Sequence, residues 1–343
     1  MKHILLGKSV EEIQELLLES SAIAKLPSYL AKQITEWIYK KNAISFDEMT
    51  NISAANRLLL NEYFSVGITA PSITHVSKDG TQKFLFGDVE TVLIPDGDRL
   101  TLCVSSQAGC KMNCAFCATG KMGFRRNLSA AEILNQYAFL ANEGRKRISE
   151  HTITNIVFMG MGEPLDNTYE VIATLHALTS DWGFALSPRR ITVSTIGIIP
   201  ALQQLIEQTE CHIAVSLHNP YHEQRLMLMP SEKVYTLENI LTLLARYDWA
   251  HQRKLSFEYV MLGGLNDSPL HAKILARLIR NLPCHVNLIP YHPHETATFI
   301  PSSRKATEAF QNILTEKGIN CTIRSSRGQD INAACGLLAV GVS

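Results

Sequence analysis

TLCVSSQAGCKMNCAFC, the stretch from Thr101 to Cys117, joins a β-rich run to three closely spaced thiols. Cys110, Cys114 and Cys117 have the spacing C-x3-C-x2-C, without a fourth cysteine to complete the motif. Three thiolates can hold three irons of a [4Fe–4S] cluster and leave the fourth iron free to coordinate a small molecule. The stretch therefore predicts an iron–sulfur centre that performs chemistry as well as storing electrons.

Structural zinc is the competing interpretation of these thiols, with Cys103 as a fourth ligand. Zinc sites usually come as two C-x2-C pairs, which is a different spacing. Cys211, Cys284 and Cys321 lie in or beside apolar, strand-like runs, so we predict that they are core residues. Cys335 lies in a loop of small residues near the C-terminus, where access suits a reactive thiol, although a passive thiol is the commoner case.

The composition is that of an ordinary globular protein. The 343 residues include 32 basic and 32 acidic side chains, and 46% of them are hydrophobic. Zero net charge does not indicate a nucleic-acid partner, so phosphate binding would need a local basic patch. No apolar stretch approaches the ~20 residues of a membrane span, and the N-terminus lacks a secretory pattern. We therefore expect a cytoplasmic protein, without membrane association, whose cysteines serve metal or redox chemistry.

The first 67 residues are predicted to form a helical accessory domain. A capping box at Ser9–Glu12 begins the first helix, a second helical pattern follows Pro27, and a third runs near Arg57–Tyr63. Residues 68–99 change to a strand-like period, with Asp79-Gly80 and Asp96-Gly97 as hairpin turns. This second segment is predicted to be a small β extension or linker.

Residues 100–343 alternate strand and helix patterns. The predicted strands are Thr101–Ser106, Ile153–Met159, Arg190–Thr195, His212–Leu217, Lys254–Leu262, His285–Pro290 and Ile319–Arg324. Six successive βα units predict an α/β fold with a parallel sheet, either doubly wound or an incomplete (β/α)6 barrel. In both folds chemistry gathers at the carboxyl ends of the strands, which is where the three cysteines lie.

Polar residues occupy further strand ends. MGMGEPL, from Met159 to Leu165, fails as a dinucleotide fingerprint because Leu165 replaces the third glycine and Pro164 has no backbone N–H. Its glycines let a ligand approach the backbone, and Glu163 is placed to accept hydrogen bonds from an ammonium group. Successive strand ends converge on one mouth, so the same ligand is predicted to contact Gly162, Glu163, Ser194, Ser216, Leu217, His218 and His292.

These motifs together closely resemble the RlmN/Cfr family of radical S-adenosylmethionine RNA adenine methyltransferases. The resemblance covers nearly the whole chain and includes LCVSSQ, SPRRITVST, the N-terminal segment Ala31–Lys40, and the two cysteines outside the triad. It implies an incomplete (β/α)6 radical SAM barrel with a helical N-terminal accessory domain. It also implies that the triad holds one [4Fe–4S] cluster and that the strand-end residues bind S-adenosylmethionine.

The resemblance implies roles for three more residues. Cys335 would take a methyl group from one S-adenosylmethionine, and a 5′-deoxyadenosyl radical from a second would remove a hydrogen from that methyl group. The resulting carbon radical would add to the adenine ring. Cys103 would attack the Cys335 sulfur, release the product and leave a transient disulfide for an external reductant to reset. Glu90 would accept a proton, and its alternative interpretation is an exposed strand carboxylate.

Within the family, GEPL at Gly162–Leu165 and FRRNL at Phe124–Leu128 favour the RlmN branch, which methylates carbon 2 of adenine. Its substrates are an adenine in the 23S rRNA peptidyl-transferase loop and the position-37 adenine of some tRNAs. Phe184–Pro188 and Ile196–Pro200 look more like the Cfr branch, which methylates carbon 8. On balance we expect carbon 2. One departure is His292, because the family commonly has asparagine there.

The expected partners are 23S rRNA, tRNA and an electron donor such as flavodoxin, and we expect a monomer. The target adenine must be extruded or offered from a loop. Candidate RNA-binding side chains are Lys121, Arg125, Arg126, Arg189, Arg190, Arg324 and Arg327, with Lys25, Lys32, Lys40 and Lys41 on the accessory helices. Two alternatives from other classes are a zinc-stabilised RNA-binding module and a radical enzyme that acts on a protein or small molecule.

Overall fold

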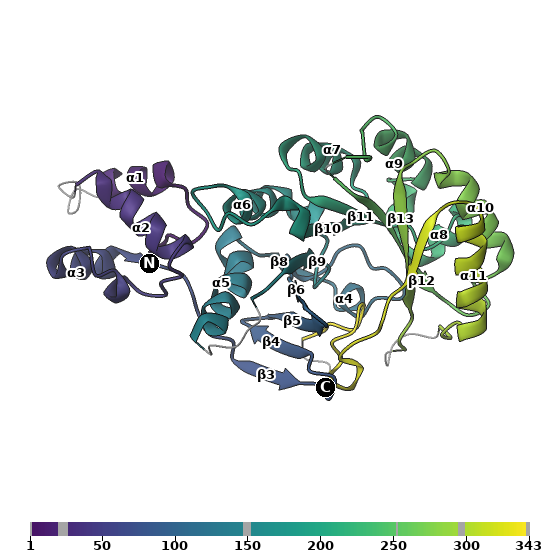
Figure 1. The fold of residues 1–343 in the computed structure, drawn as a ribbon, viewed down its shortest axis with the longest axis horizontal. Helices are drawn as coiled ribbons and strands as arrows, with labels where there is room; N and C mark the ends of the chain where they lie inside the picture. The colour runs from purple at the N-terminus through teal and green to yellow at the C-terminus, as the bar shows by residue number, and fades with distance from the viewer. Residues whose placement is uncertain (1, 20–26, 147–151, 252, 294–298, 341–343) are drawn as a thin grey trace.

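The computed structural model describes residues 2–19, 27–146, 152–251, 253–293 and 299–340, and Figure 1 shows their arrangement. Within these residues one sheet of ten strands runs in the order β14-β13-β12-β11-β10-β9-β6-β5-β4-β3. Seven of its strands are parallel neighbours: β6 Arg99–Cys103, β9 Asn155–Phe158, β10 Ile191–Thr195, β11 His212–Ser216, β12 Leu255–Met261, β13 Cys284–Pro290 and β14 Asn320–Ile323. Each predicted strand of this region is present, which confirms the α/β fold.

Helices connect these parallel strands and cover the outer side of the curved sheet (Figure 1). They are α5 Ala130–Lys146, α6 Thr168–Thr179, α7 Ile199–Gln208, α8 His222–Leu228, α9 Leu237–Leu244, α10 Pro269–Ile279 and α11 Arg304–Glu316. Because every strand lies beside the next one in the chain, six βα units curl the sheet in one direction. The sheet does not close, since β14 and β3 are its edges, and the fold is an incomplete barrel.

Short elements fill the strand-end loops. The segment after β6 contains β7 Gln107–Gly109, α4 Ala118–Lys121 and β8 Phe124–Asn127, with the cysteine motif between β7 and α4. The 3-10 turns are η1 Phe46–Glu48, η2 Pro164–Asn167, η3 Pro188–Arg190, η4 Pro230–Lys233 and η5 Gln329–Ile331.

Residues 68–99 extend the same sheet. Strands β3 Ile73–Val76, β4 Gln82–Phe86 and β5 Val89–Asp96 are antiparallel, and β5 pairs with β6. The predicted turns are present: Asp79-Gly80 lies in the β3–β4 hairpin, and Gly97 has a φ of +56° between β5 and β6. This antiparallel edge gives the C-terminal tail, residues 324–340, a surface to lie against (Figure 1).

The N-terminal region forms a helical lobe at one end of the molecule (Figure 1). It contains α1 Val10–Glu19, α2 Tyr29–Tyr39 and α3 Ala54–Tyr63, and also a short parallel pair, β1 His3–Ile4 with β2 Phe64–Ser65, that the sequence patterns did not predict. The Tyr39 hydroxyl accepts the Gly7 N–H at 2.8 Å, and its ring packs edge-on against Trp182 and Phe184 of the barrel. An aromatic contact thus joins the lobe to the barrel.

Helix starts follow the predicted capping chemistry. The Ser9 N–H donates to the Glu12 carboxylate and the Glu12 N–H to the Ser9 hydroxyl, and Ser129 with Glu132 repeats this pattern at α5. Ser268 caps α10 before Pro269. No helix in these described ranges is long and apolar enough to cross a membrane.

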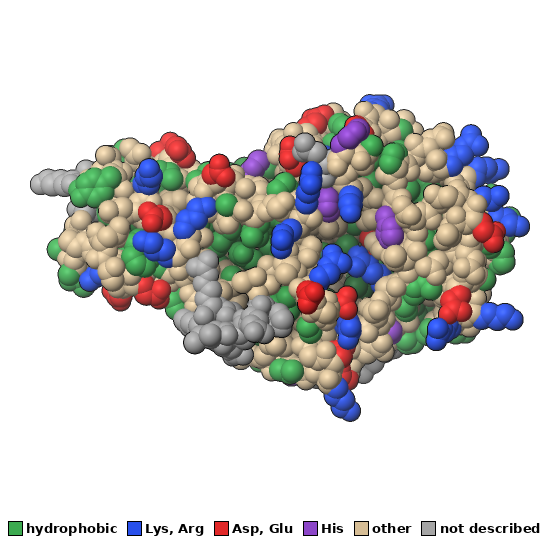
Figure 2. Space-filling model, viewed as in Figure 1, with side chains coloured by type: hydrophobic (Ala, Val, Ile, Leu, Met, Phe, Trp, Pro, Cys, Tyr) green, Lys and Arg blue, Asp and Glu red, His purple; other side chains and the backbone are tan. Residues whose placement is uncertain are grey.

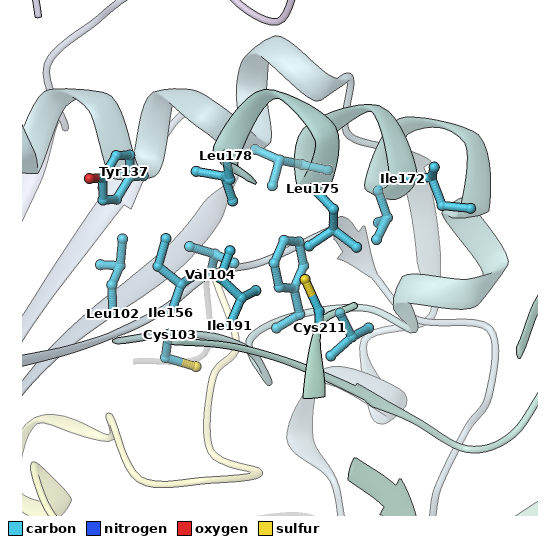
Figure 3. Packing of buried hydrophobic residues seen from close by; sticks show 14 of the residues in the cluster. Leu102, Cys103, Val104, Tyr137, Ile156, Ile172, Leu175, Leu178, Ile191 and Cys211 are labelled. Carbon is cyan, nitrogen blue, oxygen red and sulfur yellow. The ribbon is translucent and has the colours of Figure 1, made fainter. Parts of the chain in front are cut away.

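The main core lies between the sheet and its helices. Leu102 of β6 and Val104 directly after it point toward the helices, whereas Cys103 between them points to the opposite face (Figure 3). Side chains alternate along a strand, so this opposite face is the concave one on which a ligand could bind.

The three cysteines predicted to be core residues pack against apolar neighbours. Cys211 is buried and points toward the helices (Figure 3), while Cys284 and Cys321 are half-buried against the same core.

Candidate active site

A cavity opens at the carboxyl ends of the parallel strands. Its wall contains Cys110, Cys114 and Cys117 from the loop after β6 and Cys335 from the C-terminal tail. Five predicted ligand contacts also line it, namely Gly162, Glu163, Ser194, Ser216 and His218. The fold therefore gathers the cysteine motif, the strand-end residues and the tail thiol in one place.

The loop that carries the three cysteines is held from several sides. The Ala115 N–H donates to the Leu228 carbonyl at 2.8 Å, and the Cys117 N–H donates to the Cys114 carbonyl at 3.1 Å. Asn113 has a φ of +48°, the left-handed conformation that asparagine tolerates better than most residues. These contacts turn all three side chains toward the cavity.

Burial raises the pKa of all three thiols, to about 12 for Cys110, and neighbouring thiols raise it further for Cys110 and Cys114. Each thiol must therefore lose a proton when it binds iron. Three soft donors in one cavity fit a [4Fe–4S] cluster, which joins each thiolate to a different iron. Among the described residues, no three His, Cys, Asp or Glu side chains converge on a single ion position. Cys103, the fourth ligand of the zinc interpretation, does not line this cavity.

Glu163 is a buried carboxylate in the loop after β9, where it caps the 3-10 turn η2. It accepts hydrogen bonds from the Thr195 hydroxyl at 2.6 Å, the Ile196 N–H at 3.0 Å and the Leu165 N–H at 3.0 Å. Burial raises the pKa of Glu163 to about 7, although these hydrogen bonds favour the charged form. A cation that enters the cavity beside this carboxylate would favour its ionised form. An ammonium group satisfies that requirement.

Gly160 and Gly162 are needed for close packing of the protein itself, whereas the predicted reason was the approach of a ligand to the backbone. A Cβ on Gly160 would lie 2.7 Å from the Val104 carbonyl oxygen, and one on Gly162, whose φ is +99°, would lie 2.5 Å from the Gln107 Cβ. These glycines let β9 pack against the segment after β6. Gln107 in turn accepts the Glu163 N–H at 2.9 Å, so it helps to orient the carboxylate, a role that no motif had marked.

His218 presents a neutral imidazole to the cavity. Its Nδ1 accepts the Val260 N–H at 3.0 Å, so the proton of the neutral ring lies on Nε2. Burial, helped by the charge of Arg225, lowers the pKa of His218 to about 3. The ring packs edge-on against Phe116, with centroids 4.7 Å apart. His218 can therefore donate a hydrogen bond to a ligand but cannot offer it a charge.

Two predicted contacts are not part of the cavity wall. Leu217 is fully buried in the core, and its carbonyl accepts a hydrogen bond from Arg225. His292 hydrogen-bonds through Nε2 to the Ser326 hydroxyl at 2.6 Å. The structure thus places His292 against the tail.

Sequence reasoning missed two buried charged residues. Arg225 of α8 is fully buried and donates to the carbonyls of Ser216 and Leu217, both at 3.0 Å, and to the Glu232 carboxylate. Glu258 of β12 lines the cavity, accepts the Asn287 amide at 2.7 Å, and has a pKa raised by burial. The only signal in the sequence was a charge inside an otherwise apolar run.

Cys103 and Cys335 lie close enough to influence each other. Burial raises the pKa of Cys103, and the nearby Cys335 raises it further. All eight cysteines are free thiols in this structure. The Cys335 side chain is exposed into the cavity, whereas Cys103 is buried on the concave face of β6.

Glu90 lies in β5 and is not the exposed strand carboxylate of the alternative interpretation, because the residue is only 8% exposed. It forms an ion pair with Lys83 at 2.8 Å and accepts the Ala339 N–H of the tail at 3.0 Å. Glu90 does not line the cavity.

The predicted RNA-binding side chains divide into two groups. Arg126 pairs with Asp88 and Glu132, and Arg327 pairs with Asp96, so both also have structural partners. The described residues of the second group are exposed, namely Lys32, Lys40, Lys41, Lys121, Arg125, Arg189, Arg190 and Arg324, and Lys25 lies outside the described residues. Figure 2 shows Lys and Arg side chains gathered around the hollow near the middle of one face.

Comparisons with family models and with known relatives agree with one another. The chain matches the family model of the ribosomal RNA large subunit methyltransferase N-terminal domain over residues 5–66 and that of the radical SAM superfamily over residues 104–275. A probable dual-specificity RNA methyltransferase RlmN from Parabacteroides distasonis is 49% identical over 98% of this chain and 97% of its own length. The dual-specificity RNA methyltransferase RlmN of Marinobacter nauticus is 43% identical over 90% of this chain and 86% of its own length.

A solved structure gives the same result for the fold. The crystal structure of a radical SAM methyltransferase from Sphaerobacter thermophilus superimposes with a TM-score of 0.90 at 39% identity, covering 98% of this chain and 99% of that one.

Proposed function

Because the chain belongs to the RlmN family of radical SAM dual-specificity RNA methyltransferases, we propose that it methylates carbon 2 of adenine in 23S rRNA and tRNA. The substrates would be the adenine of the peptidyl-transferase loop and the position-37 adenine of tRNAs. The single observation that supports this most strongly is that Cys335 of the tail lies in the same cavity as the three-cysteine motif.

We propose that Cys110, Cys114 and Cys117 hold one [4Fe–4S] cluster and that the cavity binds S-adenosylmethionine. The Glu163 carboxylate would bind the ammonium group of the methionine moiety, and the His218 Nε2–H would donate a hydrogen bond to the same ligand. Ser194 and Ser216 add hydroxyl groups to the wall. When bound, these cofactors supply an electron and the 5′-deoxyadenosyl radical that removes a hydrogen atom from a methyl group.

The two thiols outside the triad would handle the methyl carbon. The Cys335 sulfur loses its proton and bonds to the methyl group of a first S-adenosylmethionine, so the carbon destined for adenine is held by the protein. A second S-adenosylmethionine is consumed in the radical step, in which the methyl carbon loses a hydrogen atom and bonds to carbon 2 of adenine. The ring then gives up its carbon-2 proton and one electron, which the oxidised cluster would take back. Cys103 attacks the Cys335 sulfur, the bond between that sulfur and the carbon breaks, and the carbon takes up a proton as the methylated base leaves, with a Cys103–Cys335 disulfide remaining. An external reductant supplies two electrons to restore both thiols.

The proposed thiol exchange is supported by the position of Cys103 on the concave face of the sheet, the face on which the cavity that Cys335 lines opens. Glu90 would accept a proton, and its contact with Ala339 supports a position beside the tail. The accessory lobe, residues 1–67, would bind RNA through Lys32, Lys40 and Lys41. We propose a cytoplasmic monomer that draws electrons from a donor such as flavodoxin.

Nucleoside mass spectrometry tests this function directly. The iron–sulfur-loaded protein is incubated with 23S rRNA, tRNA, S-adenosylmethionine and reductant, and the digested RNA is compared with authentic standards. We expect 2-methyladenosine in both RNAs. Appearance of 8-methyladenosine would assign the protein to the Cfr type of activity, which the Cfr-like segments Phe184–Pro188 and Ile196–Pro200 leave open. Neither product from protein with an intact cluster would exclude the proposed substrates.

A further inference from the structure

The β3–β4 hairpin turn, residues 77–81, lies outside the barrel and has no part in the chemistry described so far. Its sequence Ser77-Lys78-Asp79-Gly80-Thr81 suffices for a tight turn. One Asp79 carboxylate oxygen, Oδ1, does what a turn requires, because it accepts the Thr81 N–H at 2.9 Å. The other oxygen, Oδ2, reaches a different part of the chain.

The turn and the C-terminal tail exchange hydrogen bonds in both directions. The Asp79 Oδ2 of the turn accepts the Gly328 N–H of the tail at 2.8 Å. The Asp330 carboxylate of the tail accepts the Ser77 hydroxyl at 2.5 Å and the Lys78 N–H at 3.2 Å. Each segment thus contributes one carboxylate that binds groups of the other. We call this set of contacts, between Ser77–Asp79 and Gly328–Asp330, the carboxylate clasp.

The backbone of the tail is shaped to meet the turn. Gly328 has a φ of +63°, and a Cβ there would lie 2.8 Å from both the Thr81 Cγ2 and the Ala333 Cβ. Thr81 is fully buried under this contact. A residue larger than glycine would push the tail away from the hairpin, so the close approach is built into the sequence at Gly328.

The clasp connects to Cys335 through a short folded segment. The Ala333 N–H donates to the Gly328 carbonyl at 2.8 Å, and the 3-10 turn η5 lies between them. Beyond Cys335 the tail is held again, because the Ala118 N–H donates to the Gly336 carbonyl at 2.8 Å. The Thr119 hydroxyl donates to the Leu338 carbonyl at 2.6 Å. Cys335 therefore stands between two anchors, one on the hairpin and one on the loop that carries the cysteine motif.

We propose that Asp79 and Asp330 are positioning residues that hold the Cys335 sulfur at the reacting position in the cavity. The inference rests on the proposed function, since it assumes that Cys335 carries the methyl group. The thiol lies in a loop of small residues with no strand or helix of its own, so its location depends on the anchors. A misplacement of about 1 Å in a reacting group can reduce a rate 100-fold. The antiparallel edge of the sheet would thus serve catalysis by fixing the tail.

Alanine variants of the clasp test the proposal in the iron–sulfur-loaded, full-length protein. Asp79→Ala, Asp330→Ala and Ser77→Ala are compared with Asp98→Ala, an exposed carboxylate in the neighbouring β5–β6 turn. Hydrogen–deuterium exchange reports the protection of residues 327–339. Peptide mass spectrometry reports the rate at which Cys335 gains a methyl group from S-adenosylmethionine.

We expect Asp330→Ala to lose protection in the tail and to slow Cys335 methylation by about 10- to 100-fold. The melting temperature and the affinity for S-adenosylmethionine should stay at wild-type values, as should all properties of Asp98→Ala. Asp330→Asn should be intermediate, because its one carbonyl oxygen can still accept the Ser77 hydroxyl but the amide cannot accept the Lys78 N–H. The Ser77→Ala/Asp330→Ala double variant should be less impaired than the sum of the singles, since the two residues share a hydrogen bond.

The proposal would be overturned if Asp79→Ala and Asp330→Ala methylated Cys335 at the wild-type rate, whether or not their tails lost protection from exchange. Equal slowing in Asp98→Ala would overturn it as well. If the wild-type protein methylated neither RNA nor Cys335, the proposed function would fail. The rate of Cys335 alkylation by iodoacetamide would then decide the clasp separately, since an unchanged rate in Asp330→Ala would show that the contacts do not position the thiol.

Discussion

Glu163 illustrates how one buried residue sets the conditions for binding. Its carboxylate has three protein donors and no fixed cationic partner among the described residues, and burial raises its pKa to about 7. The ionised form binds an ammonium group and the neutral form does not. Ligand binding should therefore be linked to the loss of a proton from Glu163.

We expect the affinity for S-adenosylmethionine to rise about tenfold per pH unit up to about pH 7, because below the raised pKa Glu163 must first lose its proton. Affinity should fall again above about pH 8, where the α-amine of the ligand loses its charge. Anaerobic titration calorimetry of the iron–sulfur-loaded protein measures this affinity at a series of pH values. The series runs from about 5.5 to about 9, roughly two units on each side of the pKa of about 7. Glu163→Gln should bind about 10- to 100-fold more weakly at pH 7.5 and lack the acid limb. Identical pH profiles in the two proteins would contradict the assignment.

Replacement of Cys335 and replacement of Cys103 should stop the reaction at different steps. Cys335→Ala should abolish RNA methylation, because no thiol remains to carry the methyl carbon. Cys103→Ala should stop the reaction later, with RNA covalently attached to Cys335, since the attacking thiol is missing. Denaturing gel electrophoresis of labelled RNA distinguishes the two. Free methylated RNA at normal yield from Cys103→Ala would refute its role, and Cys211→Ala, a core thiol, is the matched control for loss of a buried cysteine.

Helix α8 supports the end of β11 through a single side chain. Arg225 donates hydrogen bonds to the carbonyls of Ser216 and Leu217 where the strand ends. Its charge is balanced by Glu232, which is 1% exposed. The strand end that carries Ser216 and His218 therefore depends on a buried ion pair.

Arg225→Met should lower the free energy of unfolding by about 3–5 kcal/mol, because it leaves the buried Glu232 carboxylate without its guanidinium partner and with only the His222 imidazole and the Leu237 N–H as partners. The double variant Arg225→Met/Glu232→Leu should recover part of that stability, since both charges are then absent. It should still bind S-adenosylmethionine more weakly than wild type, because the strand end has lost its support. Urea denaturation and calorimetry measure the two effects. A double variant as unstable as the single would show that the ion pair is not the cause.

Gly162 lets two strand ends pack together, and alanine there should be costly for two reasons. Its φ of +99° disfavours any Cβ, and that Cβ would meet Gln107. Gly87→Ala is a matched control, because Gly87 also has a positive φ, +59°, but has open space around it. We expect Gly162→Ala to lower the melting temperature more than Gly87→Ala. Equal losses would mean that only backbone strain matters.

The whole molecule assembles its cavity from distant parts of the chain. The cysteine loop, five strand ends and the tail all contribute to its wall. The amount of iron that the cavity binds therefore reports whether the complete fold has formed. Protein purified without oxygen should be brown and contain about four irons per chain. Cys117→Ala should lose most of this iron, whereas Cys284→Ala should keep it. A colourless protein with one zinc would support the zinc interpretation instead.

The sequence by itself determined the fold class and the chemical type of the site. Strand and helix periods depend on neighbouring residues, so all seven parallel strands and the capped helices could be predicted. The C-x3-C-x2-C motif is local too, and its three thiols line one cavity. The two-residue strands β1 and β2 were not predicted, because a segment that short carries no periodic pattern.

Only the tertiary structure decided which distant residues meet. Nothing in the sequence marked Arg225 as the support of Ser216 or joined Asp79 to the tail at Gly328. Gly162 carried a signal for close approach, but the neighbour proved to be Gln107 of the protein itself. Such contacts arise from the path of the chain across the sheet, and that path depends on packing over the whole molecule. Residue patterns report local geometry, whereas the position of Cys335 depends on anchors far from it in the sequence.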